Sequence, residues 1–169
     1  MSRCRMVPLT RGKVALIDED DADAILVHKW CCDPLGYAMR RQVVACGRQT
    51  TVRLHRQIMN AQPGEIVDHI NGNPLDNRKE NLRICTMRQN RQNSAKHQGR
   101  SRYKGVTMDR DQWRARIRID GKLISLGHYE SEQMAAIAYN AAAMQAFGEY
   151  ARLNTIDGQE CVSTPYTKV

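Results

Sequence analysis

The sequence is poor in aromatic residues and has no long apolar run. Aromatic side chains make up 5% of its 169 residues, which favours several small modules over one large core. No stretch of 18 apolar residues occurs, and the first residues lack the apolar centre of a secretion signal. We therefore expect no secretory leader, no membrane as a partner and a cytoplasmic location.

The sequence also lacks the paired cysteines of the common zinc sites. Six cysteines are present, but none forms a C-x-x-C pair, and cytoplasmic thiols are expected to stay reduced. One zinc site is left open as an alternative, although the spacing of its ligands matches no usual zinc knuckle. Its ligands would be His28, Cys31, Cys32 and Cys46.

What the sequence does have is an excess of positive charge in one stretch. The net charge is +8. Residues 78–118 contain 13 Lys and Arg against 3 acidic residues, whereas the rest of the chain contains 13 basic and 15 acidic residues. A nucleic acid would neutralise such a stretch and release its counterions, which drives binding. The concentration of charge favours a nucleic-acid partner over a merely solvated surface.

The pattern of apolar and turn residues predicts an α+β fold in four parts followed by a tail. The parts are a small N-terminal mixed α/β unit (1–62), a core of strand, loop, strand and helix (63–92), a basic linker (93–101), a sheet-and-helix domain (102–156) and a C-terminal tail (157–169). In the first part the expected elements are a short strand within 7–18, a helix over 22–30, strands over 37–45 and 50–54, and a short helix over 55–60.

The core and the sheet-and-helix domain have clear boundary signals. In the core, strands are expected over 65–70 and 81–85, and Thr86 with Gln89 forms a capping box at the start of a helix. In the later domain, three antiparallel strands are expected over 102–108, 112–119 and 122–129, with an Asp-Gly turn at 120–121. Ser131 begins a helix that Gly148 ends. The alanine-rich face of that helix is expected to pack on the sheet through Ala135, Ala138, Ala142 and Ala146.

Three residues of the core have the chemistry of phosphodiester hydrolysis with one metal ion. Asp68 and His69 end the first strand, and Asn90 lies one turn inside the capped helix. A carboxylate and an amide oxygen suit Mg²⁺, with Mn²⁺ as a possible substitute. A neutral imidazole held away from the metal can take the proton of an attacking water. The metal can then stabilise the charge on the phosphate and on the leaving oxygen.

The run DHINGNPLDNRKENLRICTMRQN resembles the HNH (ββα-metal) nucleases, especially phage homing endonucleases that carry Asn in place of the last His. The resemblance extends from His55 to Asn90. It implies a DNA endonuclease in which Asp68 and Asn90 bind the metal and His69 is the general base. If the protein is phage-encoded, the cytoplasm is that of a bacterial host.

The same resemblance assigns supporting roles. Asn81 is implied to be structural, holding the loop so that the His69 side chain points at the scissile phosphate. The asparagines of the loop are expected to hydrogen-bond the loop itself. They are Asn71, Asn73 and Asn77. His55 is expected to support the site or to contact DNA, without a catalytic role.

The strand expected over 112–119 separates charged from apolar side chains. Because side chains alternate along a strand, Arg114, Arg116 and Arg118 lie on one face. The other face is expected to pack on the helix through Trp113, Ala115, Ile117 and Ile119. A sheet with such a cationic face fits the major groove of double-stranded DNA, where Arg is the usual reader of guanine.

The segment 101–154 resembles the DNA-binding domain of plant Apetala-type and ethylene-response transcription factors. The matching motifs are YKGV, WRARI, LGHY, AAIAY and the closing LN. The resemblance implies that the sheet lies in the major groove. The groove-facing residues would be Lys104, Thr107, Arg116, Arg118 and Ser125. Thr107 and Asp109 stand where the plant family has arginines and Ser125 where it has tryptophan, so the plant target sequence does not carry over.

Other basic residues are expected to contact DNA around these elements. Along the helix and linker they would follow the phosphate backbone or lie in the minor groove, with a disordered tether as the alternative. They are Arg88, Arg91, Lys96 and Arg100. In the sheet-and-helix domain they are Arg102, Arg114 and Lys122.

Two functions are weighed on these grounds. One is a site-specific homing endonuclease, and the other is a sequence-specific DNA-binding regulator with an inactive nuclease core. The presence of Asp68, His69 and Asn90 favours the first. An RNA-binding or structural accessory protein rests on the charge alone. No obligate protein partner is evident, and a monomer is expected. A monomer with one active site would nick DNA, whereas a dimer could cut both strands.

Overall fold

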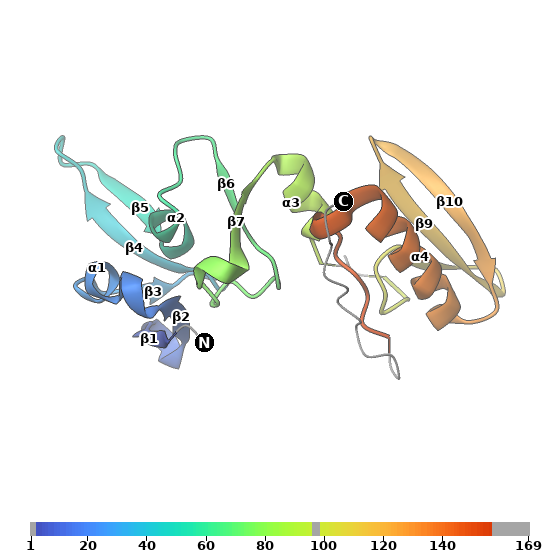
Figure 1. Ribbon diagram of the computed structural model, residues 1–169, viewed down its shortest axis with the longest axis horizontal. Coiled ribbons are helices and arrows are strands. Elements are labelled where there is room, and N and C mark those ends of the chain that lie inside the picture. The colour runs from blue at the N-terminus through green and yellow to red at the C-terminus, as the bar shows by residue number, and fades with distance from the viewer. Residues whose placement is uncertain (1–2, 96–98, 157–169) are drawn as a thin grey trace. The chain divides into compact units, whose positions relative to one another are not determined.

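The computed structural model describes residues 3–95 and 99–156 of the chain (Figure 1). The chain divides into two compact units, Met1–Arg91 and Gln92–Val169. The parts predicted at 1–62 and 63–92 thus belong to one unit. The tail predicted at 157–169 lies outside the described residues. No helix in the described ranges has both the length and the apolar character needed to cross a membrane.

The first unit begins with two small antiparallel sheets. One sheet pairs β1 (Cys4–Pro8) with β2 (Val14–Asp18), and the other has the order β3 (Cys31–Cys32), β4 (Ala38–Val43), β5 (Gln49–Arg53). Strand β1 was not predicted. Its pattern was weak because only Val7 of its five residues is buried, and the strand is defined by its pairing with β2.

Two short helices complete this part. They are α1 (Ala22–Leu26) and α2 (Leu54–Ile58). The helix expected over 22–30 therefore ends early. The reason is Trp30, whose buried indole Nε1 donates to the Ile25 carbonyl oxygen at 2.9 Å and turns the chain back onto the core. That core is one apolar cluster formed by Val7, Leu9, Ala15, Ile17, Ala22, Ile25, Trp30, Ala38 and Leu54.

The strand, loop, strand and helix predicted at 63–92 are present. Strand β6 (Ile66–His69) pairs antiparallel with β7 (Leu82–Cys85), and α3 (Met87–Asn93) follows. The capping box is confirmed, because Gln89 N donates to Thr86 Oγ1 at 3.2 Å and Thr86 N donates to Gln89 Oε1 at 2.8 Å. Strands β6 and β7 pair over four residues each, and α3 begins two residues after β7 ends.

The loop between β6 and β7 is fastened to the N-terminal strands. Leu16 N donates to the Leu75 carbonyl oxygen and Asn77 N donates to the Leu16 carbonyl oxygen, each at 2.8 Å. Lys79 N also donates to the carboxylate of Asp18 at 2.8 Å. The loop thereby continues the edge of β2, which explains why the N-terminal sheets and the β6–β7–α3 core form one unit.

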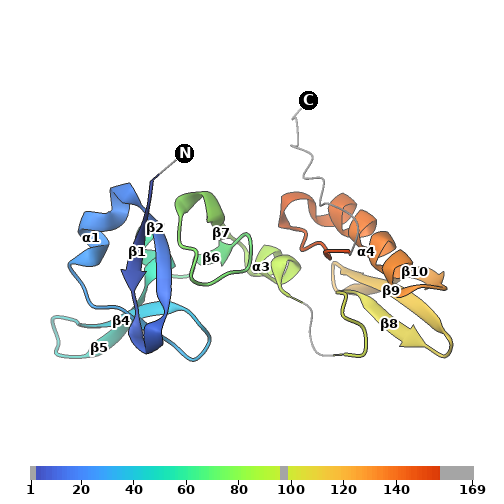
Figure 2. The same ribbon diagram turned by 90° about the horizontal axis from the view of Figure 1, so that it is seen from below.

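The second unit is a three-stranded antiparallel sheet covered on one face by a helix (Figure 2). The strand order is β10 (Lys122–Tyr129), β9 (Gln112–Ile119), β8 (Val106–Asp109), and the helix is α4 (Glu132–Phe147). The bounds expected for β9 and β10 are confirmed. Strand β8 was expected from residue 102 but begins at Val106, after Gly105 with a φ of +77°. A Cβ at Gly105 would lie 2.0 Å from the Tyr139 ring.

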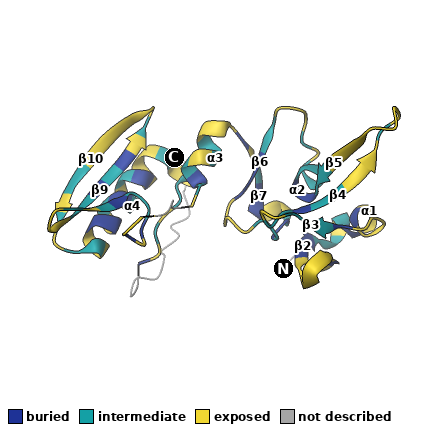
Figure 3. Cartoon of the chain, turned by 180° about the vertical axis from the view of Figure 1, so that it is seen from behind, coloured by how far each residue is buried: buried dark blue, intermediate teal, exposed yellow. Residues whose placement is uncertain are grey.

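Helix α4 has the expected start and end. Ser131 Oγ accepts from Met134 N at 3.1 Å, and Gly148 has a φ of +54°. The buried residues of the helix are Ala135, Ala136, Tyr139 and Ala143, and they pack with Ala115 and Ile117 of β9 (Figure 3). The predicted alanine face is therefore partly wrong. Ala138 and Ala142 are half-buried, and Ala146 is exposed because the buried stripe turns toward Tyr139.

Candidate active site

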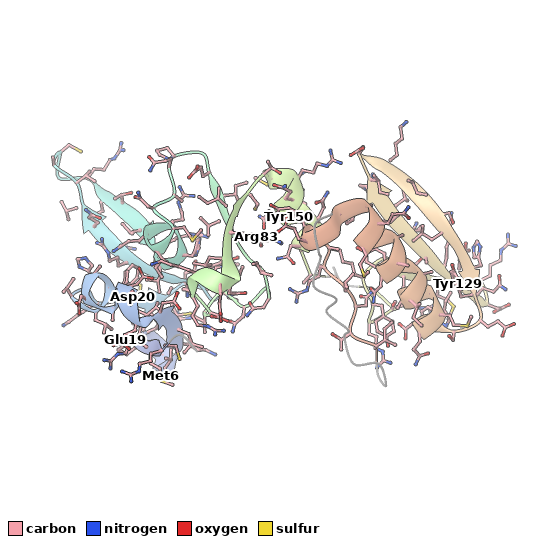
Figure 4. The ribbon with its side chains drawn as sticks, in the orientation of Figure 1. Met6, Glu19, Asp20, Arg83, Tyr129 and Tyr150 are labelled. Atoms are coloured by element: carbon pink, nitrogen blue, oxygen red, sulfur yellow. The ribbon has the colours of Figure 1, made fainter. Side chains whose placement is uncertain are left out.

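Asp68 and His69 lie at the end of β6 and point to opposite faces of the β6–β7 ribbon, because side chains alternate along a strand. Asp68 stands directly across from Arg83 of β7, and Ile66 stands across from Cys85. Asp68, Arg83 and Cys85 therefore share one face. Arg83, which projects from β7 (Figure 4), donates from Nε and Nη2 to Asp68 Oδ2 at 3.0 and 2.9 Å.

Helix α3 follows closely on the strand that pairs with β6. Cys85, the last residue of β7, lies on the ribbon face that carries Asp68, and α3 begins two residues later. Burial raises the pKa of Cys85, and the negative charge of Asp68 raises it further. Asn90 is half-buried on α3.

His69 is only 5% exposed and is held by groups on the other face of the ribbon. Its Nε2 lies 3.3 Å from Asn77 Oδ1. Asn77 is fully buried, and its Nδ2 donates to the Pro74 carbonyl oxygen at 3.4 Å. The amide oxygen of Asn77 therefore faces His69 as an acceptor, which places the imidazole proton on Nε2 and the lone pair on Nδ1.

Two more rings enclose His69. The His55 ring meets it edge to face with centroids 5.0 Å apart, and the Tyr37 ring lies 5.9 Å from it and 5.5 Å from His55. Burial lowers the pKa of His69, while the hydrogen bond to Asn77 opposes that shift. The surroundings of His69 therefore favour the neutral imidazole that can accept a proton.

His55 is buried in α2, and its ring contacts His69 instead of the surface. Of the two roles weighed for His55, these contacts favour support of the site over contact with DNA. Burial, with the neighbouring His69 next in effect, lowers its pKa to about 3. Its Nδ1 is buried and has no hydrogen-bond partner among the described residues.

The loop that follows His69 is held by its own side chains. Asn81 Oδ1 accepts from Asn71 N at 2.9 Å, and Asn81 Nδ2 donates to the Asp76 carbonyl oxygen at 2.7 Å. Asn73 Oδ1 accepts from Leu75 N at 3.1 Å. The Asp76 carboxylate accepts from Asn71 Nδ2 at 2.9 Å. Asn81 thus closes the loop, while Asn77 is the loop residue that contacts His69.

The sequence did not single out Tyr37, Asp76 or Arg83. Tyr37 lies directly before β4, and the fold brings its ring to His55 and His69. Asp76 is buried and receives Arg78 Nε and Nη2, each at 2.8 Å, which lowers its pKa. The strand register of β6 and β7 is the signal that would have identified Arg83, because it pairs with Asp68 across the ribbon.

The donor chemistry of the site fits a hard divalent cation. Asp68 supplies a carboxylate and Asn90 an amide oxygen, both preferred by Mg²⁺. Asp68 is buried, and the Arg83 guanidinium lies 2.9 Å from its Oδ2. Within 3–95 and 99–156, no three His, Cys, Asp or Glu side chains gather as a metal-binding group. The zinc alternative at His28, Cys31, Cys32 and Cys46 therefore gains no support.

The second unit carries a polar face on the side of the sheet away from α4. Arg114 and Arg116 are half-buried and Arg118 is exposed, while Ala115 and Ile117 between them are buried, so the predicted alternation is confirmed. Arg114 Nε donates to Ser125 Oγ at 3.3 Å, and its Nη1 lies 3.5 Å from Asp109 Oδ2.

His128 extends this network on the same face. Its Nε2 lies 3.1 Å from Asp109 Oδ2. The hydrogen bond and charge of His128 lower the pKa of Asp109.

A groove of about 610 Å³ lies beside this polar face. Among its walls are five residues expected to contact DNA, namely Arg100, Lys104, Thr107, Arg116 and Arg118. Lys104 differs from the expectation that it faces DNA. Its Nζ donates to the carbonyl oxygens of Gln92 and Ser94 at 2.6 and 2.8 Å, and burial lowers its pKa to about 8. It holds the preceding chain.

The other residues expected to contact DNA lie on the surface. Arg88 and Arg91 are exposed on α3, and Lys122 is exposed at the start of β10. Arg102 is exposed, with its guanidinium over the Tyr103 ring and its backbone N–H donating to Glu132. Lys96 lies outside the described residues.

Comparisons with known proteins agree on the part of the chain that carries this site. Residues 54–92 match the family model described as HNH endonuclease. The chain is also similar to an uncharacterized HNH endonuclease of Acanthamoeba polyphaga mimivirus, with 30% identity over 154 residues that cover 87% of this chain and 78% of the relative. No solved structure matches.

Proposed function

The chain belongs to the HNH endonuclease family, and from that premise we propose that Asp68, His69 and Asn90 form its hydrolytic centre. The protein is a DNA endonuclease, a hydrolase, and the family uses a divalent metal ion. The observation that carries the proposal is the environment of His69, whose imidazole is buried at the end of β6 and oriented by Asn77, with burial lowering its pKa.

The three residues divide the work between metal binding and proton transfer. Asp68 and Asn90 would hold the metal, with Mg²⁺ as the expected ion and Mn²⁺ as an alternative. When bound, the metal supplies stabilisation of negative charge on the phosphate and on the leaving oxygen. His69 would take the proton of the attacking water at Nδ1, while the proton on its Nε2 stays hydrogen-bonded to Asn77 Oδ1.

The supporting side chains serve this proton transfer. Asn81 closes the loop through two hydrogen bonds, and Asn77 fixes the His69 tautomer. His55 and Tyr37 prevent the imidazole from turning, because their rings pack on it. Only 5% of His69 is exposed, and a nucleophile as small as water is the kind that could reach its imidazole.

The second unit would supply site specificity as an Apetala-type DNA-binding domain. What supports this is a three-stranded sheet with one face covered by α4 and the other lined by Arg114, Arg116 and Arg118. Placed in the major groove of double-stranded DNA, such a face can read guanine through arginine. The protein would then cleave DNA at a defined site, as a homing endonuclease does. A monomer with one such centre would nick one strand.

Cleavage of a randomised library of DNA duplexes tests this function. The purified chain is incubated with the library and Mg²⁺, a parallel sample receives EDTA, and both strands are sequenced at the new ends. A cut at a defined sequence on one strand, abolished by EDTA, is expected. Binding of a defined sequence without any Mg²⁺-dependent cut would instead identify a DNA-binding regulator with an inactive nuclease core.

A further inference from the structure

We propose that Arg83 is a positioning residue that holds the Asp68 carboxylate in the orientation needed to bind the divalent metal. The proposal rests on the proposed function of Asp68 as a metal ligand. Arg83 lies across from Asp68 in the β6–β7 register. Neither the sequence motif nor the family resemblance singled it out.

The contact between the two side chains is short, double and buried. Arg83 Nε and Nη2 lie 3.0 and 2.9 Å from Asp68 Oδ2, so two donors of one rigid guanidinium meet a single oxygen. The side chains are 11% and 8% exposed. The register of β6 and β7 sets the two residues opposite each other, so Arg83 holds one oxygen of the Asp68 carboxylate before any metal binds.

A buried pair of this kind has a cost that points to a function beyond stability. Removing two charges from water is unfavourable, and apolar replacements of buried ion pairs are often neutral or stabilising. The face that Asp68 and Arg83 share also contains Cys85, and α3, which carries Asn90, begins two residues after it. Partners that orient a ligand carboxylate in this way are common around metal sites.

Charge and orientation predict opposite effects when Arg83 is removed. A cation next to a metal site repels the metal, so its loss should strengthen binding if charge alone mattered. Loss of an orienting partner weakens metal binding, typically 10–100-fold. The proposal is that orientation has the larger effect. Arg83→Lys separates the two, because it keeps the charge and loses the planar fork.

The test is a titration of the full chain with Mn²⁺, in which the free ion is followed by electron paramagnetic resonance. The variants are Arg83→Met, Arg83→Lys and, as the ligand reference, Asp68→Asn. The matched control is Arg5→Met, which removes an exposed ion pair with Glu19 in the same unit. Circular dichroism and thermal unfolding confirm that each variant is folded.

Both Arg83 variants are expected to bind Mn²⁺ roughly 10–100-fold more weakly than the wild type, while Arg5→Met is unchanged. Cleavage should need more metal in the same proportion and recover most of its rate at saturating metal. Tighter binding by Arg83→Met, or wild-type affinity in both variants, overturns the proposal. If Asp68→Asn also binds Mn²⁺ normally, the proposed role of Asp68 is what has failed.

A measurement on the wild type covers the case in which the variants do not fold. The Nε–H resonance of Arg83 is followed by nitrogen-15 NMR while Mg²⁺ is added. Under the proposal this proton stays hydrogen-bonded and protected from exchange with water at saturating Mg²⁺. Loss of its protection would show that the metal displaces Arg83 from Asp68, and the positioning role would then be rejected.

Discussion

The two units treat their polar side chains in opposite ways. In the first unit the polar groups around the candidate site are buried, and each has a hydrogen-bond partner among neighbouring groups, as seen for Asp68, His69, Asp76, Asn77 and Asn81. In the second unit the arginines of β9 are half-buried or exposed and alternate with the side chains of the apolar core. Proton transfer needs groups held in fixed positions. Recognition of DNA needs groups that can reach it. Loss of one contact should therefore disrupt the candidate active site, whereas loss of one charge should disrupt DNA recognition by the sheet.

Replacement of His69 should give the largest effect and should affect cleavage without affecting DNA binding. His69→Ala is expected to lower the cleavage rate by roughly 10²–10⁴-fold, as the loss of a general base does, and to leave DNA affinity nearly unchanged. Rates and affinities are measured on the duplex that the library experiment selects. His28→Ala, an exposed histidine of the same unit, is the control. Normal cleavage by His69→Ala would remove it from the role of base.

The opposite pattern is expected when the sheet loses an arginine. Arg116→Ala should weaken discrimination of the target by roughly 1–3 kcal/mol, the usual contribution of an arginine that reads guanine. The cleavage rate of bound DNA should not change. Affinities for the selected duplex and for single-base variants are compared by fluorescence anisotropy, with Lys13→Ala of the first unit as the control. Uniform weakening on every duplex would mean that Arg116 contacts phosphate instead.

The burial of His55 should make the first unit sensitive to acid. The pKa of His55 is about 3 when folded and 6.5 when unfolded, so below pH 6.5 the unfolded chain binds more protons. Stability is complete above pH 6.5 and falls as the pH approaches 3. Between pH 7 and pH 5 this group removes about 2 kcal/mol of unfolding free energy.

His55→Phe keeps a ring against His69 and abolishes that titration. Urea unfolding of the two proteins at pH 7 and pH 5 measures the difference. The variant should lose about 2 kcal/mol less than the wild type. Equal losses would show that His55 is not the group responsible.

The smallest effect is expected at the helix caps and tests whether the units respond separately. Ser131→Ala removes the hydroxyl that accepts from Met134 N and should cost about 1 kcal/mol. Hydrogen exchange of the α4 amides should quicken while β6 and β7 amides keep their rates. Thr86→Ala removes the matching cap of α3 and should leave α4 unchanged. Faster exchange in both units from either variant would contradict independent units.

Local signals predicted much of this fold, and long-range pairing decided the rest. The capping residues Thr86 and Ser131 and the alternation of β9 are local patterns, and the structure has them as expected. Strand β1 needs β2 as a partner to be recognised. Lys104 was expected to face DNA because the family pattern places it on the sheet, whereas its ammonium is held by the carbonyls of Gln92 and Ser94.

The candidate site shows the same division. Asp68, His69 and Asn90 were identified because their residue types are chemically distinctive. Arg83 and Tyr37 were not, because arginine and tyrosine are common and only the strand register or the fold brings them to the site. Sequence identified the reactive groups, and the structure was needed to find the side chains that orient them.

Asp109 stands among the arginines of the sheet, bound to His128 and near Arg114. If that sheet reads DNA, this carboxylate repels every phosphate it meets and weakens each non-specific encounter. Weaker non-specific binding means faster dissociation from non-target DNA, so less time is spent at each wrong site along a long chromosome. The acidic residue that lowers the general affinity of the surface would therefore shorten the search for the target.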